Sequence, residues 1–191
     1  KKKIAVLRDA LESEGLSPAV KTRFTEIIEK LKSEGHQVEI VDFNLLNQMV
    51  PTYYVISNAE ASSNLSRFDG IHYGYRSENA TDIESTYVNS RTEGFGIEVK
   101  RRIMMGTFVL STGYYDAYFA KAQKVRRLIQ DKTKAVFENY DFILTPTTPH
   151  AAFKLGHNSD NPVEMYLEDI FTVHANLAGN LLTAVPSGAL F

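Results

Sequence analysis

The feature that most constrains the fold is a strand–helix–strand pattern at the start of the chain. Two short apolar runs, at residues 4–7 and 38–41, predict buried strands. Between them, Ser17-Pro18 is a typical helix start, apolar residues follow at helical spacing, and Gly35 ends the pattern. A β-α-β unit over residues 3–42 predicts two parallel strands in one sheet.

The rest of the chain is dominated by helical patterns separated by glycine and proline. We expect helices at residues 45–68, 82–90, around Arg101-Arg102, 114–139 and 162–178. Pro51 lies near the start of the first of these or at a kink, and Gly94, Gly96 and Gly113 separate the middle ones. We expect strands at 141–144 and 181–185, and loops at 69–81 and 157–161. These elements predict the α/β class.

Composition excludes several classes of protein. The chain has 191 residues, of which 43% are hydrophobic, and a net charge of −2, so charge alone gives no reason to expect binding to nucleic acid or a membrane. It has no cysteine, which excludes disulfides, thiolate zinc sites and cysteine nucleophiles. No apolar stretch reaches the roughly 20 residues of a membrane span. Because the chain lacks an initial Met and ends on the apolar residues Ala189-Leu190-Phe191, we interpret residues 1–191 as a single fragment of a larger protein.

Few local motifs for chemistry are present. Residues 61–64 hold a compact serine cluster, but without a G-x-S-x-G or Ser-x-x-Lys pattern we interpret it as a helix surface where small residues allow close approach. The histidines, His174 among them, form no metal-ligand spacing, and we expect His174 to be a hydrogen-bonded helix residue. No glycine-rich phosphate loop follows a strand.

The long helix at residues 114–139 is basic and begins with aromatic residues. Two interpretations stay open: an RNA-facing stripe, or an amphipathic helix with a solvated basic face and an aromatic core face, which we favour. The residues concerned are Lys121, Lys124, Arg126, Arg127, Lys132 and Lys134, together with Tyr114, Tyr115, Tyr118 and Phe119.

Three residues far apart in the sequence have the chemistry to bind a free amino acid. A zwitterion needs an arginine for its α-carboxylate and an acid for its α-ammonium, and a tyrosine adds a hydroxyl contact. Arg102, in an apolar and glycine-punctuated segment, Asp169 and Tyr53 supply these groups. The residues alone equally allow ordinary surface ion pairs.

Long stretches resemble the A subunit of the bacterial Glu-tRNA(Gln)/Asp-tRNA(Asn) amidotransferases, within the amidase-signature family. They are residues 51–54, 59–70, 93–126, 145–149 and 165–179. The resemblance implies a mixed β-sheet wrapped by helices and hydrolysis of glutamine to supply ammonia for converting Glu-tRNA(Gln) or Asp-tRNA(Asn). It also implies that the serine–cis-serine–lysine triad lies N-terminal to this chain, which would be the C-terminal part of the family's full-length protein and inactive alone. Residues 180–186 depart from the family pattern.

The resemblance assigns glutamine binding to Tyr53, Arg102 and Asp169, with Arg102 on the α-carboxylate and Asp169 on the α-ammonium. It implies the B and C subunits as partners, contact with tRNA through the B subunit, and a cytoplasmic location. It also implies that the partner subunit, rather than this chain, uses ATP and Mg²⁺. From the residues themselves we expect no metal site and no membrane association. Two alternatives remain: another amidase-signature hydrolase of small amides, and a module that docks partner subunits or tRNA. A fragment missing sheet partners would also expose apolar edges and self-associate.

Overall fold

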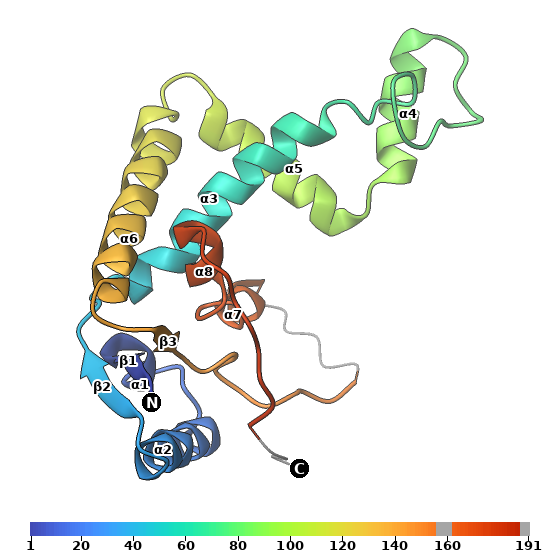
Figure 1. Cartoon of the computed structure of the whole chain (residues 1–191). Coiled ribbons are helices and arrows are strands. Elements are labelled where there is room, and N and C mark those ends of the chain that lie inside the picture. The colour runs from blue at the N-terminus through green and yellow to red at the C-terminus, as the bar shows by residue number, and fades with distance from the viewer. Residues whose placement is uncertain (156–161, 188–191) are drawn as a thin grey trace. The chain divides into compact units, whose positions relative to one another are not determined.

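The β-α-β unit is present in the computed structural model, which describes residues 1–155 and 162–187 (Figure 1). Strand β1 (Lys3–Leu7) pairs in parallel with β2 (Gln37–Val41), with Ile4 opposite Val38, and helix α2 (Pro18–Ser33) connects them after the short α1 (Arg8–Leu11). The Ser17 side chain accepts a hydrogen bond from the backbone N–H of Val20 at 3.4 Å, and Gly35 has a φ of 86°, so both predicted helix boundaries are confirmed.

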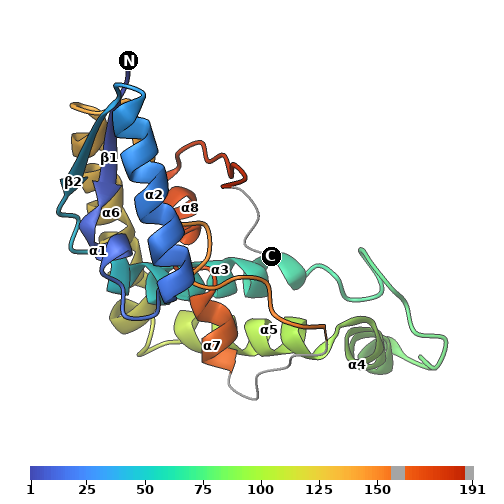
Figure 2. The same cartoon turned by 90° about the horizontal axis from the view of Figure 1, so that it is seen from below.

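A third strand, β3 (Phe142–Leu144), pairs with β1 on its other side, also in parallel. The sheet order is β2-β1-β3, and β1 is buried along both faces from Ile4 to Leu7, as expected of a central strand. Helix α2 runs alongside the sheet (Figure 2), where its Phe24 and Ile28 pack with Val6 of β1. The α/β class is confirmed, and the three strands found in the described ranges are all parallel.

The helices after β2 are α3 (Leu46–Leu65), α4 (Ile83–Gly94), α5 (Ile97–Leu110), η1 (Asp116–Ala120), α6 (Lys121–Phe137), α7 (Pro162–Leu167) and α8 (Val173–Ala178). Pro51 lies inside α3, in its first turns, as predicted. Asp82 caps α4 through a reciprocal pair of hydrogen bonds with Ser85, although α4 continues four residues past the predicted end. The predicted loop at 157–161 lies outside the described residues.

Two predictions near the end of the chain are wrong. The helix expected at 162–178 is divided into α7 and α8 by a turn at residues 168–172. In this turn the carbonyl oxygen of Asp169 accepts hydrogen bonds from the Thr172 hydroxyl at 3.1 Å and from the backbone N–H of Thr172 at 3.0 Å. Residues 181–185 form no strand: Gly179, with a φ of 76°, ends α8, and no strand among the described residues pairs with this segment.

The long basic helix is only partly as expected. It begins with a π-helical turn, η1, and Tyr114, Tyr115 and Tyr118 are each more than two-fifths exposed, so the expected aromatic core face is not buried in this structure. Its amphipathic character is confirmed further along α6, where Ile129 and Thr133 are buried while Lys124 and Lys134 face solvent.

The chain divides into two compact units. One comprises Lys1–Pro51 and Lys124–Phe191, and the other comprises Thr52–Gln123. That residues 1–191 are one piece of a single domain therefore stays a prediction. Within the described ranges, no helix has both the length and the apolar composition needed to cross a bilayer.

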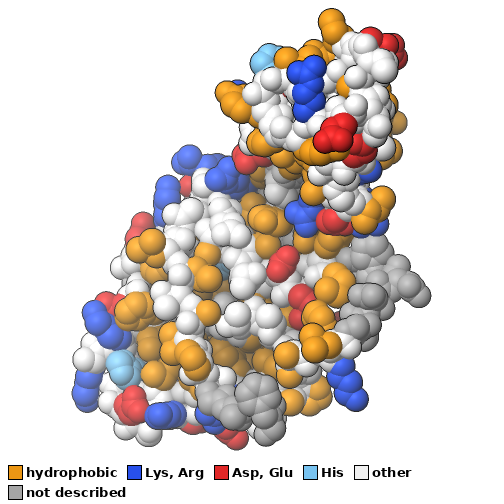
Figure 3. All heavy atoms as spheres, turned by 90° about the vertical axis from the view of Figure 1, so that its right-hand side faces the viewer, with side chains coloured by type: hydrophobic (Ala, Val, Ile, Leu, Met, Phe, Trp, Pro, Cys, Tyr) orange, Lys and Arg blue, Asp and Glu red, His pale blue; other side chains and the backbone are white. Residues whose placement is uncertain are grey.

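Hydrophobic side chains are open to solvent on the surface of each unit. Figure 3 shows many of them on one face, scattered among charged groups. On α5, Ile97 is 75% exposed and Met104 is 73% exposed, and Phe142 at the end of the sheet is 54% exposed. Single exposed hydrophobic side chains of this kind are normal on protein surfaces and do not by themselves mark an interface. Self-association of this chain stays a prediction.

Candidate functional site

Arg102 lies on α5 with its guanidinium fixed by two neighbours. Its Nε donates to Oε1 of Glu98, one helical turn earlier, at 3.1 Å. Its Cζ lies 5.7 Å from the centre of the Tyr54 ring, within the range of a cation–π contact. The side chain is 35% exposed, so it is neither fully hydrated nor inaccessible. An arginine held in this way presents a planar set of donors suited to a carboxylate.

Tyr53 lies close to the same place. It is half-buried on α3, and its ring meets the Tyr54 ring edge-on at 5.3 Å between centroids. Tyr54 therefore touches both of the predicted residues, Tyr53 along the chain and Arg102 across the helix pair. Sequence reasoning did not single out Tyr54, because nothing in the pattern distinguishes it from its neighbour.

A close crossing of α3 and α5 brings these side chains together. A Cβ added to Gly106 of α5 would lie 2.0 Å from the carbonyl oxygen of Asn58 and 2.5 Å from Cβ of Ser62, both on α3. Beside this contact, Oγ of Ser62 lies 3.0 Å from Oγ1 of Thr107, a hydrogen-bond distance. The serine cluster on α3 therefore serves close helix approach, which confirms the interpretation made from its small residues.

Asp169 belongs to the other compact unit. It lies in the turn between α7 and α8 with an exposed side chain, and its carbonyl oxygen accepts from the backbone N–H of Val173 at 3.1 Å. Tyr53 and Arg102 thus each contact the Tyr54 ring. The convergence of Asp169 with them stays a prediction.

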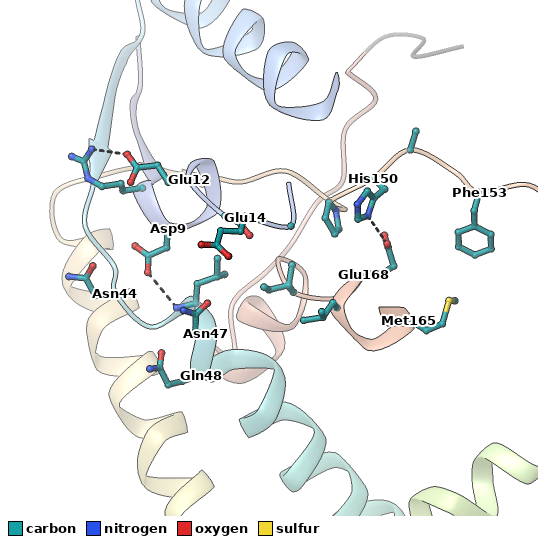
Figure 4. A pocket seen from close by; sticks show the side chains of 18 residues that line it. Asp9, Glu12, Glu14, Asn44, Asn47, Gln48, His150, Phe153, Met165 and Glu168 are labelled. Atoms are coloured by element: carbon teal, nitrogen blue, oxygen red, sulfur yellow. Dashed lines mark hydrogen bonds and ion pairs between the residues drawn. The ribbon is translucent and has the colours of Figure 1, made fainter. Parts of the chain in front are cut away.

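A pocket of about 1060 Å³ lies in the unit that contains Asp169, at the carboxyl ends of the parallel strands (Figure 4). Each strand is followed by segments that line it, which is where ligand sites of parallel α/β sheets usually lie. The lining residues include Arg8, Asp9, Glu12 and Glu14 after β1, Asn44, Asn47 and Gln48 after β2, His150 and Phe153 after β3, and Met165 and Glu168 in and just after α7.

Hydrogen bonds organise the wall of this pocket. The Asp9 carboxylate accepts from the backbone N–H groups of Phe43 at 3.3 Å and Leu46 at 3.4 Å, so it caps the start of α3. Burial alone would raise the pKa of Asp9, but the backbone hydrogen bonds from Asn44, Leu46 and Phe43 outweigh it and lower the pKa below its ordinary value. Across the pocket, Nδ1 of His150 lies 2.8 Å from Oε1 of Glu168.

Sequence reasoning did not predict the pocket. Its residues come from four separate segments, and the one available indication was that polar residues follow predicted parallel strands. Among the residues that the structure describes, no group of three or more histidine and acidic side chains is arranged to hold a metal ion.

Comparisons with known proteins agree on one family. A model of the amidase family matches residues 1–189. The A subunit of glutamyl-tRNA(Gln) amidotransferase from Latilactobacillus sakei is 54% identical over 97% of this chain, and its counterpart from Clostridium botulinum is 49% identical over 99% of it. The chain spans only 38% and 39% of the length of these two relatives.

Solved structures lead to the same family. The crystal structure of the glutamyl-tRNA(Gln) amidotransferase A subunit from Thermotoga maritima aligns with a TM-score of 0.65 at 43% identity, covering 94% of this chain and 34% of that one. A crystal structure of an amidase aligns with a TM-score of 0.66 at 19% identity, covering 93% of this chain and 36% of that one, and supports the fold alone.

Proposed function

The chain belongs to the amidase family, and on that basis we propose that it is part of the glutaminase subunit, the A subunit, of a tRNA-dependent amidotransferase. In this proposal it carries the residues that bind glutamine, while the serine nucleophile and its lysine lie in a part of the glutaminase subunit outside this chain. The chain alone is then inactive. Its 54% identity to the A subunit of a glutamyl-tRNA(Gln) amidotransferase supports this assignment over a general amidase.

The observation that carries the proposal is the setting of Arg102. Glu98 orients its guanidinium at 3.1 Å, the Tyr54 ring lies against it, and Tyr53 adjoins that ring at 5.3 Å. A half-buried arginine against one phenol ring, with a second phenol next to that ring, is suited to a carboxylate that also accepts a hydroxyl hydrogen bond. We assign the glutamine α-carboxylate to Arg102 and Tyr53.

Glutamine is a zwitterion, so its α-ammonium needs an acid, and we assign that role to Asp169. Holding both charged groups leaves the side-chain amide as the end that can reach a nucleophile. The ammonia released would then pass to the B subunit, which uses ATP and Mg²⁺ and contacts the tRNA, with the C subunit completing the complex in the cytoplasm.

Steady-state glutaminase kinetics of the whole glutaminase subunit, in complex with its partners, test the proposal. Arg102→Lys keeps the positive charge but loses the planar set of N–H donors that can bind a carboxylate in pairs. We therefore expect the KM for glutamine to rise by about ten- to a hundredfold, equivalent to roughly 1.4–2.8 kcal/mol. The matched control is Arg101→Lys, because Arg101 is adjacent, more exposed and paired with the same Glu98. Equal KM values for the two variants would contradict the assignment.

The same preparation separates the alternatives. A hydrolase of small amides would cleave a simple amide such as propionamide about as efficiently as glutamine, whereas an amino-acid site strongly prefers glutamine. A docking module for tRNA would bind tRNA on its own with a steep salt dependence, because phosphate contacts release counterions.

A further inference from the structure

The turn that carries Asp169 is tied to the start of helix α8. The carbonyl oxygen of Asp169 accepts hydrogen bonds from the backbone N–H of Thr172 at 3.0 Å and of Val173 at 3.1 Å. It also accepts one from the Thr172 hydroxyl at 3.1 Å. Because these donors converge on one backbone oxygen, the Asp169 backbone moves with the first residues of α8. Whatever holds α8 in place therefore places Asp169.

Helix α8 is too short to be stable on its own. It has six residues, and isolated helices of that length do not form in water. Its buried residues, Val173, His174, Leu177 and Ala178, share one face. The position of α8 must therefore be set by the elements that pack on this face.

Side chains on one face of α6 form hydrogen bonds with both ends of α8. Arg126, Gln130 and Thr133 follow one another at helical spacing on α6. At the far end of α8, Nε of Arg126 and Nε2 of Gln130 both donate to the Leu177 carbonyl oxygen, each at 3.2 Å. That carbonyl belongs to the last turn of α8, where backbone acceptors lack helical partners.

The near end is held by a buried hydrogen bond between Thr133 and His174. Oγ1 of Thr133 lies 2.8 Å from Nε2 of His174, and the same hydroxyl donates to the Ile129 carbonyl oxygen at 2.6 Å. Since the hydroxyl has one proton, its oxygen accepts from His174, whose Nε2 carries the hydrogen. The Phe43 ring lies 4.9 Å from the imidazole ring. Burial lowers the pKa of His174 to about 4, so the ring is a neutral donor at neutral pH.

We propose that the Thr133–His174 hydrogen bond, together with the contacts of Arg126 and Gln130 to Leu177, positions Asp169 to receive the α-ammonium of an amino-acid substrate. Thr133 is then a positioning residue that touches no substrate and acts through α8. The inference rests on the proposed function, because it takes the role of Asp169 from there.

The test compares two substrates that differ only in the group Asp169 would meet. Glutaramate is glutamine without the α-amino group, so its hydrolysis does not depend on that contact. In the whole glutaminase subunit with its partners, the ratio of kcat/KM for glutamine to that for glutaramate measures recognition of the ammonium. Asp169→Asn should abolish most of this preference.

Thr133→Val replaces the hydroxyl with a methyl group of similar size. We expect it to lower the glutamine preference about tenfold, through KM, with kcat on glutaramate unchanged, and we expect Thr133→Ser to restore it. Gln130→Met, at a half-buried site, removes the donor to the Leu177 carbonyl oxygen at the C-terminal end of α8. We expect it to lower the glutamine preference about threefold. Lys134→Met, an exposed change on the same helix, is the control and should have no effect.

The outcomes separate this inference from the proposed function. If Asp169→Asn loses the preference while Thr133→Val and Gln130→Met keep it, α6 does not position Asp169 and the inference is wrong, although the proposed function stands. If the α6 variants impair both substrates equally, their role is merely structural, and the inference is again wrong. If Asp169→Asn keeps the preference, the assignment of Asp169 fails, and this inference fails with it.

Discussion

Gly106 is the residue at which the packing of α3 on α5 is most sensitive to a single methyl group. A Cβ there would lie 2.0 Å from the Asn58 carbonyl oxygen, which would have to retreat by about 1.4 Å to reach an ordinary contact of 3.4 Å. The obstacle is helix backbone and cannot rotate away, unlike the end of a flexible side chain. Gly106→Ala must therefore move α3 and α5 apart.

The cost of that movement follows from known overpacking effects. Extra methyl groups in packed cores cost about 1–3 kcal/mol, and the better helix propensity of alanine returns about 1 kcal/mol. The difference is about 0–2 kcal/mol, and because the clash is with backbone we expect the upper half of that range, a net loss of about 1–2 kcal/mol in the free energy of unfolding. We also expect a higher KM for glutamine, since the crossing places Arg102 against Tyr54.

Urea denaturation and glutaminase kinetics of the whole glutaminase subunit measure both effects. Gly96→Ala, at the start of the same helix, is the matched control because a Cβ there meets nothing within 4 Å. A Gly106→Ala variant as stable as this control, with an unchanged KM, would refute the argument that the close crossing builds the arginine site.

Two further predictions concern the unit that holds the sheet. Burial lowers the pKa of His174 to about 4, against an ordinary value of 6.5. The neutral ring therefore contributes about 3 kcal/mol of stability above pH 6.5, and this contribution is lost as the pH falls toward 4. Urea midpoints at pH 7.5 and 5 should differ more in the native protein than in His174→Gln. Ser17→Ala removes the cap of α2 and should lower the free energy of unfolding by about 1 kcal/mol, whereas Ser33→Ala, at the exposed end of α2, should change the urea midpoint little.

Local patterns were enough to predict the β-α-β unit, because each of its boundaries depends on nearby residues. Ser17 caps α2 directly, Gly35 takes the left-handed conformation after it, and the apolar run at residues 4–7 becomes the central strand. The α/β class followed from the same alternation of strand and helix.

Features that depend on distant partners were not predictable in this way. The break between α7 and α8 lies in a turn at residues 168–172, which the apolar spacing over 162–178 did not indicate. The contact of Arg102 with Tyr54 depends on a helix crossing that Gly106 permits, and one glycine in a helical pattern does not identify its neighbour. The strand expected at 181–185 needed a pairing partner that the described part of the chain does not provide.

A crystal structure of the whole glutaminase subunit with glutamine bound, obtained with the nucleophile inactivated, would show directly which residues hold the amino-acid end of glutamine. We expect the α-carboxylate at the Arg102 guanidinium and the Tyr53 hydroxyl, and the α-ammonium at the Asp169 carboxylate. Glutamine bound elsewhere, or bound with its α-carboxylate away from Arg102, would contradict it.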